Sequence, residues 1–459
     1  MNSVRHGGRL LLARRAAGSG VQILNLVVFT KKLRFRPRLG LFAALLLTTG
    51  FSRAEGSAPL PAFPFIREIV FEGNDTTQPK TMLRELVIHN GDPAEPGAIE
   101  RSRQGIQDLG LFRSVEVEQR PYADGVQLVF RVREKYYIVP SPRADANSDG
   151  QYAYGVQLRW YNVWGLNHTL RTTLKYRNRQ EADRGTALVF SGGYSAPLVF
   201  DSPYSVSASG AYSREPVESV QPYDEVTANT RVTLSRTLWN EGPASQGATA
   251  GIGVQWQEQT TDGDFAPPPQ GHAIALVLNG GYSSVRNKLY SEEGYALGFE
   301  ILSAGEKFGS DYAFNSAGGS FDGSWAVGET PHQTLGIFAR AGTYHGGVPG
   351  SLPPFDLGGV DSLRGYRRQV LRGDGFYYGG VEFLRPLRWN WLRSLAFIEA
   401  GDIIRGDGKA LVEGPFADIG IGVRTRLTWF VRVDLSLGVA WPLVDAGDGG
   451  GMRVFAGGS

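Results

Sequence analysis

The residue in this chain with the most distinctive chemical setting is Arg364, in the run Gly358-Gly359-Val360-Asp361-Ser362-Leu363-Arg364-Gly365-Tyr366. Glycine lets a backbone turn freely and pack closely, so this run can carry one guanidinium into a confined place. One interpretation is a loop tucked inside a barrel, with Arg364 held by a carboxylate of the wall. The other is a solvated loop with a turn at Arg364-Gly365. Either way, the chemistry is charge pairing.

The sequence shows no arrangement of residues that is typical of a catalytic site. The chain contains no Gly-x-Ser-x-Gly motif and no loop of the kind that cradles phosphates. The six histidines lack the spacing of a metal site. They are His6, His89, His168, His272, His332 and His345. The sequence therefore predicts no enzyme, no metal site and no cofactor.

The composition limits the number of domains, the partners and the kinds of site. The chain has 459 residues, 61 glycines, 11% aromatic residues, no cysteine and a net charge of +2. This length fits two or three average domains, or one small domain and a large barrel. A balance so close to neutral argues against nucleic acid as a partner. The lack of cysteine excludes a disulfide scaffold and a thiolate metal site.

The first 54 residues are typical of a targeting segment. A basic stretch over residues 31–38 precedes the mostly apolar run Leu39–Phe51, and Ser52-Arg53-Ala54 supplies a small-x-small cleavage site. We interpret residues 1–54 as a basic lead with a secretory signal peptide, and 55–65 as a Pro-rich linker. The alternative is a membrane anchor helix, but the run is shorter than the roughly 20 residues that a span needs. No later segment has 18 consecutive apolar residues, so a membrane role would depend on strands.

Residues 66–135 have the pattern of a small α+β domain. Ile66–Asn74 predicts a strand, and Lys80–Ile88 and Pro96–Leu111 have the apolar spacing of helices. Phe112–Glu118 alternates as a strand does, and Val126–Glu134 returns after an Asp-Gly turn. The predicted order is β-α-α-β-β.

From Tyr136 onward the chain consists of short alternating runs separated by polar turns. In Leu170–Arg177, and more strongly in Phe430–Trp441, apolar residues occupy one face and polar residues the other. In a soluble sandwich the apolar face packs on a second sheet, and in a membrane barrel it faces lipid. An even strand number is typical of closed bacterial barrels. We predict sixteen strands, near 136–146, 152–162, 168–177, 186–195, 204–213, 225–238, 248–258, 272–283, 295–304, 313–326, 333–343, 376–385, 393–401, 416–427, 430–441 and 451–458.

Four short motifs in the second half occur in a family-specific order. They are the run at residues 358–366, Phe376–Leu387, Phe397–Asp402 and Asp418–Arg424. In this order they resemble the carboxy-terminal, bacterial surface antigen barrel of the BamA/TamA outer-membrane protein assembly and secretion superfamily. The resemblance implies a barrel over residues 136–459.

The first domain resembles a POTRA domain. Its matching residues are Phe71, Gly73 and Asn74 in the opening, and Gly110 and Phe112 in the join before the second strand. Together the two resemblances imply an α+β POTRA domain, residues 66–135, followed by a 16-stranded antiparallel transmembrane β-barrel.

The superfamily's loop arginine pairs with acids on neighbouring strands. At the matching positions this chain has Arg364, Gly365 and Tyr366 in the loop, with Glu382 and Glu399 as acids. Strand alternation agrees, because the apolar neighbours of each glutamate would face lipid while the glutamates point inward. Two inward carboxylates could hold one guanidinium by bidentate hydrogen bonds. Relatives usually carry Asp at the position of Glu399. The alternative is that both glutamates are ordinary hydrated lumen residues.

The resemblance also implies a function. It predicts a protein of the bacterial outer membrane whose POTRA domain, in the periplasm, binds unfolded polypeptide clients, while its barrel inserts them into the membrane or translocates them across it. Outer-membrane lipid and possible accessory periplasmic or lipoprotein subunits are the other implied partners. The alternatives are a POTRA domain that only spaces the barrel, and a passive channel or surface receptor on the same scaffold.

Two features bear on how such a barrel would act. Only one POTRA module fits before the barrel, which argues against general assembly, whereas the lack of a recognisable plug helix argues against dedicated secretion. The last strand is short and Gly-rich around Phe455, and the first contains Pro140 and Pro142. Proline removes a ladder hydrogen bond, so this seam would pair weakly and could open towards lipid.

Overall fold

The computed structural model describes most of the chain after residue 62. The described residues are 63–146, 152–178, 187–217, 223–239, 242–264, 266, 268–269, 271–347, 354–367, 370–404, 414–447 and 451–458. The chain divides into two compact units, Met1–Pro59 and Leu60–Ser459, and all described residues belong to the second. The expected signal peptide and most of the expected linker lie outside them. Within the described residues, no helix is long and apolar enough to cross a membrane.

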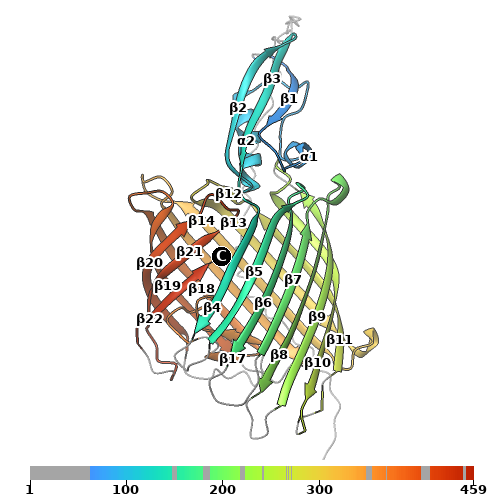
Figure 1. The fold of residues 1–459 in the computed structure, drawn as a ribbon, viewed down its shortest axis with the longest axis vertical. Helices are drawn as coiled ribbons and strands as arrows, with labels where there is room; N and C mark the ends of the chain where they lie inside the picture. Colours follow the sequence, from blue (N-terminus) through green and yellow to red (C-terminus); the bar gives the residue numbers. More distant parts are fainter. Residues whose placement is uncertain are drawn as a thin grey trace, which may run out of the picture. The chain divides into compact units, whose positions relative to one another are not determined.

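A small α+β module comes first (Figure 1). Its elements are β1 (Ile66–Glu72), α1 (Pro79–Leu83), α2 (Pro96–Asp108), β2 (Phe112–Tyr122) and β3 (Gly125–Glu134). The three strands form a sheet in the order β1-β3-β2, with β1 parallel and β2 antiparallel to β3. The predicted order β-α-α-β-β is confirmed.

The first helix is shorter than the sequence predicts. The apolar spacing indicated a helix over Lys80–Ile88, but α1 ends at Leu83. Beyond it, the backbone N–H of Val87 donates to the hydroxyl of Ser102 on α2 (3.0 Å), which replaces a helical bond. Leu86 and Ile88 are still buried. Helical spacing therefore marked the residues that enter the core, but tertiary contacts decided where the helix stops.

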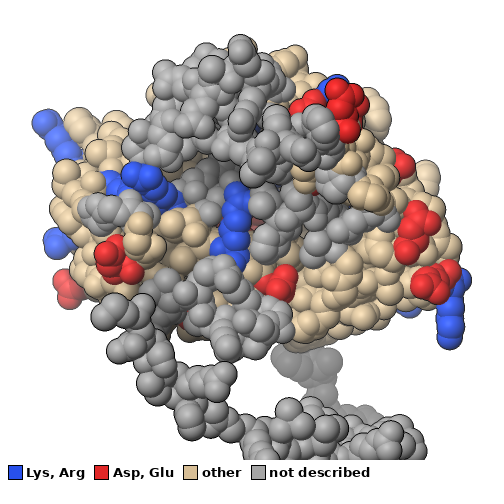
Figure 2. Space-filling view, turned by 90° about the horizontal axis from the view of Figure 1, so that it is seen from below, with Lys and Arg blue, Asp and Glu red and all other residues tan. Residues whose placement is uncertain are grey.

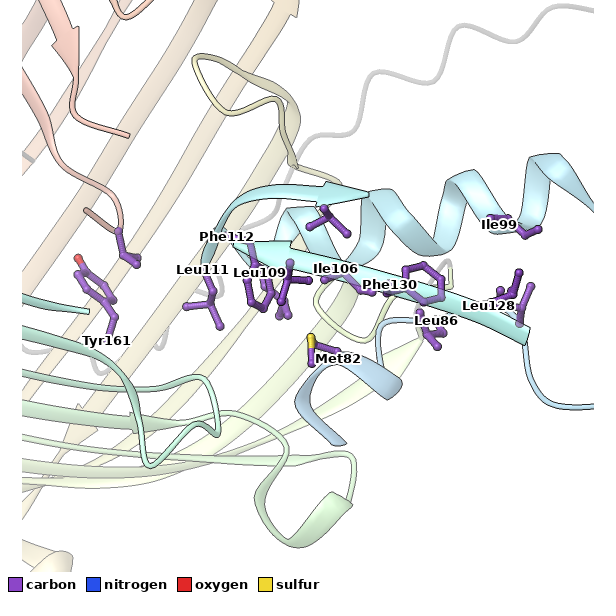
Figure 3. Packing of buried hydrophobic residues seen from close by; sticks show 14 of the residues in the cluster. Met82, Leu86, Ile99, Ile106, Leu109, Leu111, Phe112, Leu128, Phe130 and Tyr161 are labelled. Atoms are coloured by element: carbon purple, nitrogen blue, oxygen red, sulfur yellow. The ribbon is translucent and has the colours of Figure 1, made fainter. Parts of the chain in front are cut away.

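The core of this module lies between the helices and the sheet. Side chains from α1, α2, β2 and β3 point toward one another in Figure 3, and they are almost fully buried. Met82, Ile106, Phe112, Leu128 and Phe130 are each 0% exposed. The same apolar cluster includes Val431 and Val433. The sequence predicted a strand from Phe430, but β21 begins only at Asp434, because the preceding residues turn and pack into this cluster.

A closed antiparallel barrel follows (Figure 1). In the described residues it contains sixteen long strands and the two-residue β12 (Arg286–Asn287), so the predicted number is confirmed. The long strands are β4 (Ile138–Ala146), β5 (Tyr152–Val163), β6 (His168–Asn178), β7 (Ala187–Ala196), β8 (Tyr204–Val217), β9 (Tyr223–Trp239), β10 (Gly247–Asp262), β11 (Gly271–Ser283), β13 (Glu292–Ala304), β14 (Phe314–Ala326), β15 (Thr334–Gly346), β18 (Gly375–Pro386), β19 (Leu392–Ile404), β20 (Phe416–Arg426), β21 (Asp434–Pro442) and β22 (Arg453–Gly458).

Successive side chains of these strands alternate between lipid and lumen. On β10, Ile252 and Val254 are 59% and 53% exposed, whereas Gln255 and Gln257 are buried. Outward apolar and inward polar residues are what a barrel in a bilayer requires. Figure 2 views the molecule from below, and basic and acidic side chains are interspersed among uncharged residues on this face.

Candidate functional site

The site is built on the connection between β15 and β18. Two short strands, β16 (Phe355–Leu357) and β17 (Leu371–Gly373), pair with each other and frame this loop. Gly358 has φ +114°, and a Cβ there would lie 2.1 Å from the carbonyl oxygen of Arg367, so only glycine fits. The loop has an apolar core that includes Leu357, Leu363 and Leu371, all at most 3% exposed. It is therefore a packed element rather than a solvated turn.

Arg364 projects from this loop onto the inner wall and meets both predicted acids. Its Nε and Nη2 donate to Oε1 of Glu399 at 2.9 and 2.5 Å, and its backbone N–H donates to Oε2 (3.1 Å). Its Nη2 also donates to Oε1 of Glu382 (2.8 Å). The three side chains are 8%, 1% and 15% exposed for Arg364, Glu399 and Glu382. The structure thus brings the predicted residues together in a place with little water.

The arrangement differs in one respect from the predicted bidentate grip. One oxygen of Glu399 accepts both side-chain bonds from Arg364. The two-oxygen fork is made by Arg424 on β20, whose Nη1 and Nη2 donate to Oε2 and Oε1 of Glu382 at 2.8 and 2.9 Å. Glu382 therefore links two arginines, one from the loop and one from the wall.

Aromatic side chains enclose the guanidinium. The Cζ atom of Arg364 lies 3.6 Å from the ring centre of Phe397 on β19 and 5.4 Å from that of Phe455 on β22. The hydroxyl of Tyr378 on β18 donates to Glu399 Oε1 (2.9 Å). A cation over a ring face is attracted by the ring quadrupole, most strongly where water is excluded. Through Phe455, Arg364 also touches the last strand.

Gly365 and Tyr366 attach the loop at a second point. The N–H of Gly365 donates to Oδ2 of Asp418 on β20 (2.7 Å), and a Cβ on Gly365 would lie 2.7 Å from the Cβ of Asp418. The Tyr366 hydroxyl lies 2.8 Å from the carbonyl oxygens of both Ala417 and Val444. We call Arg364, Gly365, Tyr366, Glu382 and Glu399, together with Arg424 and Asp418, the loop lock.

Sequence reasoning missed two members of the loop lock. Arg424 and Asp418 both lie in the Asp418–Arg424 motif, which had been used only to identify the barrel. They are lumen-facing residues of β20, because Ile419 and Ile421 between them are 45% and 56% exposed. Strand alternation could therefore have found them as inward-facing residues.

The predicted POTRA residues shape the turn after β1 or pack in the core of the domain. Gly73 has φ +83°, and a Cβ there would lie 2.2 Å from the carbonyl oxygen of Val132. Asn74 Nδ2 donates to the carbonyl oxygen of Thr77 (2.9 Å), and Phe71 packs 5.8 Å from the Phe130 ring. Phe112 is fully buried in the core.

Gly110 joins α2 to β2 in a left-handed conformation, φ +73°. Its carbonyl oxygen accepts a hydrogen bond from Nζ of Lys135 (2.9 Å), at the point where the domain meets the barrel. Burial of that ammonium, with Arg426 nearby, lowers the pKa of Lys135 to about 8. No group of three or more metal-ligating side chains occurs in the part of the chain that the structure describes.

Comparisons with known proteins agree with this architecture. Residues 64–135 match the family described as "Surface antigen variable number repeat", POTRA. The chain is 24% identical over 402 residues to the outer membrane protein assembly factor BamA of Nitratidesulfovibrio vulgaris, an alignment covering 82% of this chain and 46% of that protein. It is 32% identical over 91 residues to BamA of Neorickettsia risticii, covering 20% of this chain and 12% of that one. The chain thus spans about half the length of the first of these relatives.

Two solved structures have the same fold. CdiB from Escherichia coli superposes with a TM-score of 0.59 at 16% identity, over 86% of this chain and 75% of that one. BamA from Haemophilus ducreyi lacking POTRA domains 1–3 gives a TM-score of 0.51 at 16% identity, over 86% and 84%. Fold and site together define a POTRA domain joined to an outer-membrane barrel. In this architecture the chain is similar to BamA and CdiB, and the likeness places it in the outer membrane with its POTRA domain in the periplasm.

Proposed function

We propose that this protein moves polypeptides into or across the outer membrane, and that it does so without enzymatic chemistry. In this proposal the POTRA domain binds an unfolded periplasmic client, and the barrel inserts or exports it. The observation that carries the proposal is the loop lock. A passive pore needs no buried arginine that ties a long loop to three strands of the wall, since such a contact is costly to desolvate unless it is fully paired.

The free edge of β2 supports the client-binding step. In the described residues, β2 pairs with β3 on one side and with no strand on the other. An unpaired edge can add an extended peptide through main-chain hydrogen bonds, which do not depend on the side chains of the peptide. The edge carries Glu118 and Gln119, both exposed, so an incoming strand would pair at a solvent-accessible surface.

The last strand supports the release step. β22 has six residues, whereas its partner β21 has nine, and its Phe455 contacts the loop lock through Arg364. A short strand contributes few ladder bonds, so the proposal places the opening towards lipid at this seam. In that arrangement the loop lock holds the last strand in place while no client is present.

Depletion of the protein in its own host tests the proposal. Quantitative proteomics of the outer membrane and the medium would then be compared before and after depletion. A broad fall in many barrels would indicate assembly, and loss of one or two secreted or surface proteins would indicate a dedicated exporter. No change in either fraction would reject the proposal in favour of a passive channel or surface receptor.

Site-specific crosslinking tests the client-binding step. Because the sequence contains no cysteine, an introduced cysteine is the single reactive thiol. A single Gln119→Cys on the free edge of β2 is expected to crosslink to unfolded clients in the periplasm. The matched control is Asn90→Cys, an exposed residue in the connection between α1 and α2. Equal crosslinking at both positions would contradict edge pairing and leave the POTRA domain as a spacer.

A further inference from the structure

A hollow of about 310 Å³ lies beside the end of α1, at the barrel end where β7 turns into β8 and β9 ends. Its walls include Arg84 just after α1, Leu198 and Asp201 of the β7–β8 turn, and Leu238 and Trp239 of β9. Ligand pockets in proteins begin at roughly this volume. None of the contacts assigned above to the loop lock or to the β2 edge involves these residues.

The apolar wall of the hollow continues the lipid-facing surface of the barrel. Leu238 and Trp239 are 63% and 56% exposed, at the end of a strand whose Val232 and Leu234 face lipid. Phe200, on the adjoining turn, is 98% exposed. Tryptophan and phenylalanine at the end of a membrane strand mark the boundary between hydrocarbon and headgroups. The hollow therefore opens at the periplasmic headgroup layer.

One wall of the hollow carries a cation with spare donors. Of the five N–H groups of Arg84, the structure gives one a long hydrogen bond, from Nη2 to the carbonyl oxygen of Leu166 (3.4 Å). Among the described residues, its buried Nε has no hydrogen-bond partner, and it lies 3.7 Å from Glu85 Oε1. Burial also lowers the pKa of Arg84, which means that its charge is poorly solvated.

The same hollow carries an anion. Asp201 lies in its lining, and Oδ2 of Asp201 is 3.7 Å from Nζ of Lys80. Its side chain is 62% exposed, so it keeps room for a second cation. A guanidinium and a carboxylate beside an apolar wall match a phosphate and an ammonium at the end of an acyl chain.

The turn that supplies Asp201 is held in an unfavourable backbone conformation. Leu198, Phe200 and Asp201 have φ of +51°, +55° and +55°, although none is glycine. Such residues cost of order 1 kcal/mol or more each and persist where other interactions hold them. With this conformation Leu198 and Asp201 line the hollow, while the Phe200 side chain stays exposed.

We propose that this hollow binds one phospholipid whose zwitterionic headgroup carries a primary ammonium, which can donate hydrogen bonds to a carboxylate. Its phosphate lies on Arg84, its ammonium on Asp201, and an acyl chain covers Leu238 and Trp239. The bound lipid bridges the POTRA domain and the β8–β9 side of the barrel, and so couples the position of that domain to the membrane surface. The site is separate from the polypeptide transport proposed above.

Trp239 makes the proposal measurable, because it lines the site. Full-length protein is reconstituted in nanodiscs of phosphatidylcholine containing rising fractions of brominated phosphatidylethanolamine, phosphatidylglycerol or phosphatidylcholine. The signal of Trp239 is the fluorescence of the unchanged protein minus that of Trp239→Phe. Saturable quenching is expected with the ethanolamine lipid, at a half-maximal fraction roughly tenfold below that of the other two, as expected for one extra charge-assisted contact. Quenching proportional to bromolipid fraction and equal for all headgroups would mean ordinary surrounding lipid and overturn the proposal.

Three variants separate the parts of the site, each first checked for folding by heat-modifiable gel mobility. Ala244→Leu fills the hollow and is expected to abolish saturable quenching, while Arg84→Gln weakens it for every phosphate headgroup. Asp201→Asn should remove only the preference for ethanolamine over glycerol headgroups. The control is Arg236→Gln, a cation near the same strand end that lies over Tyr204, outside the hollow. A loss with Arg236→Gln equal to that with Arg84→Gln would show general headgroup attraction and reject the site.

Discussion

Two of the arginine–glutamate clusters in the described part of the barrel differ chiefly in their access to water. In the loop lock, Arg364 is 8% exposed and its partners Glu399 and Glu382 are 1% and 15% exposed. The second cluster lies on earlier strands of the barrel, where Arg231 of β9 pairs with Glu300 of β13 (2.6 Å). These two side chains are 28% and 37% exposed. Distances are similar in both clusters. Burial, rather than the presence of an ion pair, therefore distinguishes the one that can hold a loop.

Their surroundings explain this difference. Arg231 also donates to Gln255 Oε1 (2.8 Å from Nε), a neutral amide beside other polar lumen residues. Arg364 lies between Phe397 and Phe455, and its glutamates are further bonded to Tyr378 and Arg424. Exposed pairs contribute about 0–1 kcal/mol, whereas removing one partner of a buried pair costs about 3–5 kcal/mol.

The largest predicted effect is the loss of stability on truncating Arg364, compared with truncating Arg231 in the exposed cluster. Arg364→Ala should lower the free energy of unfolding by about 3–5 kcal/mol, because Glu399 and Glu382 lose a buried cation. Arg231→Ala should lower it by about 1 kcal/mol or less, because water replaces the lost partner. Urea unfolding of the detergent-folded barrel, followed by tryptophan fluorescence, measures both. Equal losses in the two variants would show that burial does not set the strength of these clusters.

A smaller effect is predicted for the second arginine of the loop lock. Arg424→Gln removes the two-oxygen fork on Glu382 but leaves that carboxylate its bond from Arg364. We expect a loss of about 1.5–3 kcal/mol, the usual contribution of hydrogen bonds to charged groups. Arg340→Gln is the matched control, since Arg340 pairs with Asp322 where both are more than a third exposed. Both variants are measured by urea unfolding, and equal losses would show that the Arg424–Glu382 contact stabilises no more than an exposed pair does.

Shortening Glu399 tests how well the loop lock is fitted. Glu399→Asp keeps the charge but withdraws the carboxylate by one methylene from Arg364 and Tyr378. The expected cost is about 1 kcal/mol, roughly one net hydrogen bond. Glu300→Asp in the exposed cluster should have no measurable effect. If Glu399→Asp left the free energy of unfolding unchanged, the loop would be able to move and restore the contact with the shorter side chain.

The smallest effect concerns a buried carboxylate, Glu85, whose neighbouring cation Arg84 lies 3.7 Å away and makes no hydrogen bond to it within the described residues. Glu85 is 1% exposed, and its Oε2 accepts a hydrogen bond from the N–H of Ser245 (3.1 Å). Burial raises the pKa of Glu85 above its usual 4.5, and Asp108 nearby adds to the shift. Because the folded state holds this proton more tightly than the unfolded state, ionisation costs stability at pH above the folded pKa, and the cost disappears as pH falls through it.

Glu85→Gln should therefore be slightly more stable than the unchanged protein at pH 8, by about 1 kcal/mol, the scale of one buried polar group. The two should converge as pH falls towards 4.5, and urea midpoints at pH 5, 6.5 and 8 would reveal this. A variant that is less stable at pH 8 would show that the charge on Glu85 is compensated after all.

Much of the fold followed from local patterns. A period of two, repeated over runs of about ten residues, predicted sixteen strands and the faces of Glu382 and Glu399, because alternation is fixed by the strand itself. The order of strands and helices in the POTRA domain was predicted equally well. The end of α1 was not, since contacts of Val87 and Leu86 with α2 decided it.

The sequence by itself determined which residues face inward and which short motifs carry the family resemblance. Only the tertiary structure decided which inward residues meet. Arg424 reaches Glu382, Phe455 reaches Arg364, and Arg84 shares a hollow with Asp201. Each of these contacts depends on strand register, on the path of a loop or on the placement of one element against another. These are set by packing between distant segments, whereas alternation is a property of each strand alone.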